Sequence, residues 1–133
     1  MNKSLTKIKA LIFETYGLLY FKLVNLTDDD RSTGLSLEEA LEMYQQGVTF
    51  VDARKPAEWR RGSIKRALFA SGAEFDQVSP KPAHDDVLVT FCEAGDRAKN
   101  AAQKLREQGY INVYYLRGGG FASWANAGYP VAA

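Results

Sequence analysis

Cysteine and histidine are scarce in this sequence, which contains one of each among 133 residues. A single cysteine excludes a disulfide bond within the chain, and it has no second thiol in the chain to react with. The chain is long enough for one domain that buries roughly 65–70% of its unfolded surface. It therefore needs neither a disulfide nor a metal ion to fold, and its 46% hydrophobic and 25% charged residues are ordinary for a globular protein.

Excess charge and long apolar runs are also missing. The net charge is +1, so the composition does not favour nucleic acid or an anionic membrane as a partner. The uncharged run Thr15–Phe21 is far shorter than the ~20 residues of a membrane-spanning helix. Lys3, Lys7 and Lys9 precede an apolar patch as in a signal peptide, but Glu14 interrupts that patch. We predict a cytoplasmic protein that binds neither nucleic acid nor membrane.

Residues 1–33 are predicted to form an N-terminal extension and linker before a domain at 34–133. Apolar residues in 5–12 have near-helical spacing, 19–26 is compatible with a strand, and 28–34 is polar and rich in turn formers. The extension is expected to pack on the domain surface or on a second subunit. A homodimer formed through this extension is therefore one of the predicted assemblies.

From residue 35 onward, short apolar strands alternate with helices. Ser36 and Glu39 have the spacing of a capping box, and Gly47 ends the helix that follows. Further helices are expected at 56–61, 98–108 and 121–127, a helical turn at 72–78, and strands at 48–51, 67–70, 87–91 and 111–116. This alternation predicts an α/β fold with a parallel sheet, in which sites form beyond the carboxyl ends of the strands. Asp52 and Cys92 both follow such ends.

The stretch around Cys92 is the main candidate site. An apolar strand ends at this cysteine, and residues 93–97 lead into a helix. The first N–H groups of a helix lack intrahelical partners and carry partial positive charge, so they stabilise a thiolate or another anion placed there. Gly95 allows the tight turn that such a loop requires. Arg97 is expected to bind the oxyanion part of a donor through a bidentate contact.

Several segments, taken in order, carry a resemblance over about residues 35–131. They are Phe50-Val51-Asp52-Ala53-Arg54, Glu58-Trp59, Gly62, Val89-Thr90-Phe91-Cys92-Glu93-Ala94-Gly95-Asp96-Arg97-Ala98, Ala101-Ala102, Leu105, Gly109-Tyr110, Val113-Tyr114, Leu116-Arg117-Gly118-Gly119, Trp124 and Gly128-Tyr129-Pro130. In this order and spacing the sequence resembles the rhodanese-like sulfurtransferase family. The resemblance implies a single domain with a central parallel five-stranded sheet and helices on both faces.

The resemblance also implies a reaction. The Cys92 thiolate takes a sulfane sulfur from thiosulfate or a persulfide donor, and the resulting persulfide passes it to cyanide or a thiol acceptor. No metal or organic cofactor is required, and a protein is an alternative donor or acceptor. The substrate-binding and persulfide-binding loop consists of Glu93, Ala94, Gly95, Asp96 and Arg97.

Residues outside this loop receive supporting roles. Asp52 and Arg54 are expected to brace the loop or to cap neighbouring backbone groups without touching the substrate, while Glu58 and Trp59 are interpreted as structural. The glycines after Arg117 are predicted to form a turn beside the site. Phe121 and Trp124 are expected in the core, and His84 is not expected to be catalytic.

Two departures from the family pattern are present, one that affects a turn and one that bears on the substrate. Family members often read Gly-His-Ile-Pro-Gly-Ala where this chain has Gly62-Ser63-Ile64-Lys65-Arg66-Ala67. Glu93 and Asp96 would repel an anionic donor, which favours a protein persulfide or a small persulfide as an alternative to thiosulfate.

Two other functions are kept as alternatives. A non-enzymatic persulfide carrier or protein-interaction module would use the same domain. A phosphatase or arsenate reductase would resemble a Cys-x5-Arg loop, but that pattern places arginine where this chain has Ala98, one residue after Arg97. The shorter ring suits a sulfur atom better than a tetrahedral phosphate.

Overall fold

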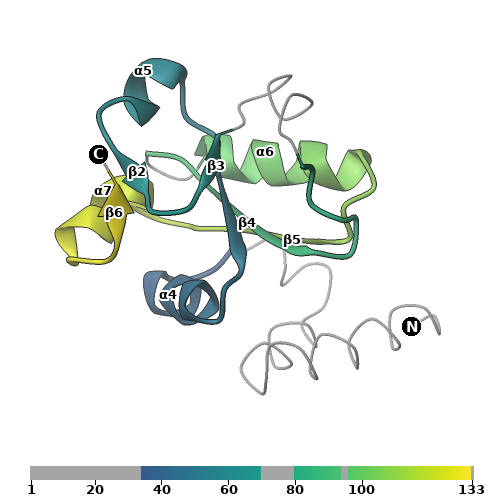
Figure 1. Ribbon diagram of the computed structural model, residues 1–133, viewed down its shortest axis with the longest axis horizontal. Coiled ribbons are helices and arrows are strands. Elements are labelled where there is room, and N and C mark those ends of the chain that lie inside the picture. The colour runs from purple at the N-terminus through teal and green to yellow at the C-terminus, as the bar shows by residue number, and fades with distance from the viewer. Residues whose placement is uncertain (1–33, 70–79, 94–95, 133) are drawn as a thin grey trace. The chain divides into compact units, whose positions relative to one another are not determined.

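The computed structural model describes residues 34–69, 80–93 and 96–132 (Figure 1). These residues belong to a compact unit that spans Gly34–Ala133. The expected helix at 5–12, the strand at 19–26 and the turn at 72–78 lie outside the described residues. The division between residues 33 and 34 and the homodimer through the extension therefore stay predictions.

A parallel sheet forms the centre of the fold, as predicted. Its strands lie in the order β3 (Leu68–Phe69), β1 (Thr49–Asp52), β4 (Val87–Phe91) and β5 (Asn112–Tyr115). The register places Asp52 beside Phe91, so β1 and β4 end level with each other. As a consequence, the two residues singled out from the sequence, Asp52 and Cys92, lie at the same edge of the sheet.

The structure does not contain the predicted fifth strand of the sheet within the described residues. Leu35 takes the position next to β5, where its N–H donates to the Tyr115 carbonyl at 2.7 Å and its carbonyl accepts from the Arg117 N–H at 3.0 Å. This contact is an isolated parallel bridge between Leu35 and Leu116 and not a strand. The described residues thus contain four strands of this sheet and one bridge.

Helices cover both faces of the sheet (Figure 1). On one face, Phe50 of β1 packs its ring against Tyr44 of α4 (Leu37–Gln45) and Trp124 of α7 (Gly120–Asn126). On the other face, α6 (Asp96–Glu107) contributes the buried residues Ala98, Ala102 and Leu105. The side chains of β4 alternate between these two layers because successive strand residues point to opposite faces. Within the described part of the chain, no helix is long and apolar enough to cross a membrane.

The helix boundaries follow the local sequence with small corrections. The capping box is confirmed, with Ser36 N–H donating to Glu39 Oε1 at 2.9 Å and Glu39 N–H donating to Ser36 Oγ at 3.1 Å. The helix α5 (Pro56–Trp59) ends two residues earlier than predicted. The helix α6 begins at Asp96, two residues earlier than predicted. The prediction was based on the apolar residues of this helix, and its first two residues, Asp96 and Arg97, are polar.

A second, smaller sheet was not predicted. It pairs β2 (Ser63–Ile64) with β6 (Val131–Ala132) in an antiparallel arrangement. Each strand is too short to show a period of two in the sequence, and the pairing joins residues far apart in the chain. It positions Ser63, whose hydroxyl reaches the site.

Candidate active site

The main chain at Cys92 is held between β1 and α7. The Ala53 N–H donates to the Phe91 carbonyl at 2.8 Å, and the Phe121 N–H donates to the Cys92 carbonyl at 2.8 Å. Gly120 has φ +44°, and a Cβ atom there would clash with the Cys92 carbonyl oxygen. Glycine is thus required for the close approach of the chain to Cys92. The glycine turn lies beside the site, as predicted.

The Cys92 side chain is buried. It is 1% exposed and lies in an apolar cluster with Val51, Leu88 and Ala98, on the face of the sheet that α6 covers. Ala94 and Gly95 lie outside the described residues, so the predicted cradle of N–H groups from residues 93–97 stays a prediction.

Asp52 and Arg54 form a buried ion pair at the end of β1. Their side chains are 0% and 3% exposed. Arg54 Nη2 donates to Asp52 Oδ2 at 2.9 Å, Arg54 Nε donates to Oδ1 at 3.1 Å, and the Arg54 N–H also donates to Oδ1. Ser63 Oγ donates to Asp52 Oδ2 at 2.7 Å. These contacts satisfy a carboxylate that would otherwise be costly to bury.

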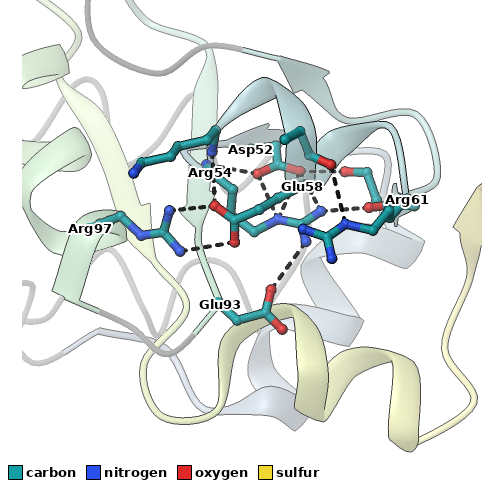
Figure 2. Close-up of polar contacts among 10 residues, drawn as sticks. Asp52, Arg54, Glu58, Arg61, Glu93 and Arg97 are labelled. Atoms are coloured by element: carbon teal, nitrogen blue, oxygen red, sulfur yellow. Dashed lines mark hydrogen bonds and ion pairs between the residues drawn. The ribbon is translucent and has the colours of Figure 1, made fainter.

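Arg54 extends this network to the residue after the cysteine. Its Nη1 donates to Glu93 Oε2 at 3.1 Å (Figure 2), and its Nη2 donates to the Gly62 carbonyl at 2.6 Å. Its guanidinium lies 4.2 Å from the ring centre of Phe121. Burial alone would lower the pKa of Arg54. Asp52 and Glu93 outweigh this effect through their hydrogen bonds to Arg54 and their negative charges, so the pKa of Arg54 is raised overall. Arg54 thus holds Glu93 to the end of β1, and its predicted role in bracing the rest of the loop stays a prediction.

Arg97 is paired with a residue that the sequence analysis left outside the site. Its Nη1 donates to Glu58 Oε1 at 2.7 Å and its Nη2 donates to Oε2 at 3.1 Å (Figure 2). Hydrogen bonding to Arg97 is the main cause that lowers the pKa of Glu58 to about 2, so Glu58 is ionised at neutral pH. The bidentate face of Arg97 that was expected to bind a donor is occupied by Glu58.

The pKa of Arg97 is raised by the acidic groups around it. The hydrogen bond to Glu58 is the largest cause of the raised pKa of Arg97; burial lowers it, and the negative charges of Glu58, Cys92 and Glu93 raise it further.

A cavity of about 260 Å³ opens at the carboxyl ends of β1 and β4. It is lined by Arg54, Glu58, Arg61, Gly62, Glu93 and Phe121. Cys92 is not part of this lining, but its chain neighbour Glu93 is, and so is Phe121, whose N–H binds the Cys92 carbonyl. The cavity thus lies directly beside the main chain of the candidate nucleophile.

Three of these lining residues were not predicted as part of the site: Glu58, which was interpreted as structural, Arg61 and Phe121. Phe121 was expected in the core but is only half-buried and forms part of the cavity wall, whereas Trp124 is in the core as expected. Arg61 stands next to Arg60 at the end of α5, and nothing in the local sequence distinguishes the arginine that faces the cavity. His84 packs against the Tyr110 ring, outside the cavity wall.

Comparisons with known proteins agree with this architecture. A family model for the rhodanese-like domain matches residues 36–127. GlpE, a thiosulfate sulfurtransferase of Haemophilus influenzae, is 33% identical over 94 residues, which cover 71% of this chain and 89% of the relative. A rhodanese-related protein from Thermoplasma volcanium has a TM-score of 0.62 and 26% identity, covering 74% of this chain and 96% of its own.

A further structural neighbour carries a different description. It is a Rhodopseudomonas palustris protein of unknown function, described as a possible tyrosine phosphatase. Its TM-score is 0.63 at 25% identity, and the match covers 78% of this chain and 89% of the neighbour.

Proposed function

Because the chain belongs to the rhodanese-like domain family, we propose that it is a sulfurtransferase with Cys92 as its nucleophile. The Cys92 thiolate attacks the outer sulfur of thiosulfate, the S–S bond of the donor breaks, and sulfite leaves with the electron pair. The new persulfide is then attacked at its outer sulfur by cyanide or a thiolate, and Cys92 leaves as the thiolate. A persulfide donor reacts in the same way, with a thiolate as leaving group.

One observation carries this proposal above the others. Cys92 follows the central strand β4 directly, and Arg54 ties the next residue, Glu93, to the end of β1. This arrangement braces the main chain next to Cys92 and places it beside a cavity with charged walls, which supports a role for this cysteine in binding and reacting with a substrate. A cytoplasmic location stays a prediction.

Intact mass spectrometry after incubation with thiosulfate tests the proposal. The protein is expected to gain one sulfur atom, and added cyanide is expected to remove it. If neither thiosulfate nor a small persulfide adds a sulfur to the protein, the proposal is wrong. Sulfur loading without turnover above background would instead favour the persulfide carrier.

Arg97 and Glu58 allow a test of donor binding. If Arg97 contributes to binding of thiosulfate, Arg97→Ala raises the KM for thiosulfate by roughly 10-fold, the value of one charge-assisted hydrogen bond. Glu58→Gln removes the competing carboxylate and is expected to leave this KM unchanged or lower it. Steady-state kinetics with thiosulfate and cyanide measure both.

Two outcomes would contradict the role of Arg97. An unchanged KM in Arg97→Ala would remove its part in anion binding. An equal rise of KM in both variants would show that Arg97 acts by holding Glu58 in place.

The phosphatase alternative has less support. Arg97 lies five positions after Cys92, one fewer than the Cys-x5-Arg loop requires. Hydrolysis of a generic aryl phosphate by the purified protein separates this function from sulfur transfer.

A further inference from the structure

Arg61 lines the cavity and, among the described residues, forms no ion pair with a carboxylate. Its Nε donates to the Ala57 carbonyl at 3.4 Å, which is a long contact. Within the described ranges, its terminal nitrogens take part in no hydrogen bond or ion pair, whereas Arg54 is paired with Asp52 and Glu93. In the view of Figure 2, Arg61 lies on the opposite side of Arg54 from Arg97. The cavity therefore offers one exposed guanidinium to a ligand.

Glu93 offers the complementary charge in the same cavity. Its side chain is 45% exposed, and only its Oε2 atom binds Arg54. The Oε1 atom has no partner within the described part of the chain and remains available to a donor group. The other carboxylate of the wall, Glu58, has both oxygens engaged by Arg97.

We propose that Arg61 and Glu93 together select a zwitterionic thiol, one that carries both a carboxylate and an ammonium group, as the sulfur acceptor. This inference rests on the proposed function and names the substrate class of the same site. Arg61 would bind the carboxylate, since guanidinium and carboxylate match in geometry, and Glu93 would bind the ammonium. Cyanide has neither a carboxylate for Arg61 nor an ammonium group for Glu93. The Glu93 carboxylate repels thiosulfate.

The size and position of the cavity agree with such an acceptor. A volume of about 260 Å³ is several times that needed by a small inorganic anion and suits a molecule the size of an amino acid or a short peptide. Glu93 immediately follows Cys92 and belongs to the cavity wall, so an acceptor bound there lies beside the main chain of the nucleophile. The acceptor thiolate attacks the outer sulfur, the Cys92 S–S bond breaks, and Cys92 takes the electron pair. The proton of the acceptor thiol passes to water.

Four small thiols with different charges test the proposal. Cysteine carries both groups, mercaptopropionate only the carboxylate, cysteamine only the ammonium, and mercaptoethanol neither. The rate at which each removes sulfur from the loaded protein is measured for the wild type, Arg61→Gln and Glu93→Gln. Arg60→Gln is the matched control, because Arg60 is exposed and does not line the cavity. Comparing variants with one acceptor at a time cancels the differences in thiol reactivity.

Each substitution has its own expected pattern. Arg61→Gln is expected to lower kcat/KM by roughly 10-fold for cysteine and mercaptopropionate, the value of one charge-assisted contact, and to spare the other two thiols. Glu93→Gln should lower it for cysteine and cysteamine. Arg60→Gln should leave all four acceptors unchanged.

Other outcomes would overturn the inference. Equal losses for all four thiols in Arg61→Gln would make Arg61 a general structural residue, and unchanged values would remove it from recognition. An equal loss of kcat/KM in Arg60→Gln would show that the effect of Arg61→Gln comes from the net charge of the surface and not from contact with the acceptor. If the wild type is not loaded with sulfur at all, the proposed function itself fails, and this is visible before any acceptor is added.

Discussion

Cys92→Ser is expected to abolish sulfur loading and to reduce thiosulfate:cyanide turnover by roughly 10³-fold or more, since removing a nucleophile eliminates the covalent route. The hydroxyl of serine is a far weaker nucleophile than a thiolate at neutral pH, and it forms no persulfide. Intact mass spectrometry measures the loading, and thiocyanate formation measures turnover. Full activity in the variant would refute the assignment of Cys92.

Folding of the variant has to be checked because Cys92 is buried among apolar side chains. A serine hydroxyl is more polar than a thiol and is therefore less favourable to bury in such a cluster. Cys92→Ala avoids this cost and serves as the second variant. Loss of loading in both variants, with thermal unfolding close to that of the wild type in Cys92→Ala, assigns the effect to chemistry and not to misfolding.

Arg54→Met is expected to destabilise the domain by about 3–5 kcal/mol. Methionine keeps much of the side-chain volume but leaves the buried Asp52 carboxylate with Ser63 and main-chain contacts only, so an uncompensated charge remains in the interior. The variant also frees Glu93 from β1, and slower sulfur loading at Cys92 is expected to follow. Urea denaturation measures the free energy of unfolding, and mass spectrometry measures the loading rate.

Arg60→Met is the matched control for this second prediction. Arg60 is exposed, and substitutions at such positions usually change stability by less than about 0.5 kcal/mol. An effect of Arg54→Met no larger than that of Arg60→Met would show that the Asp52–Arg54 pair does not hold the loop. A stability loss with unchanged loading would confine Arg54 to folding.

Much of the fold could be predicted because its signals are local. The capping box at Ser36 involves residues three apart, and the apolar run 87–91 identifies the central strand by itself. Alternation of strands and helices then implies a parallel sheet, since parallel neighbours need a crossover helix. The level ends of β1 and β4 place Asp52 and Cys92 together, as the sequence analysis expected from strand-end positions alone.

The partners of the charged residues could not be predicted in the same way. Glu58 and Arg97 are 39 positions apart, as are Arg54 and Glu93. No periodic sequence pattern links residues so far apart, so the sequence does not indicate which arginine pairs with which glutamate. Arg97 was therefore predicted to bind a donor, whereas the structure pairs it with Glu58.

The sequence by itself determined the parallel α/β architecture, the position of the lone thiol at a strand end and the glycine turn beside it, because these depend on short-range patterns. Tertiary structure decided that the thiol is buried, that Phe121 joins a cavity wall and that Arg61 and Glu93 face the same cavity. These features depend on how distant segments pack against one another. Only the folded chain determines which side chains are buried and which charged groups have no counterion.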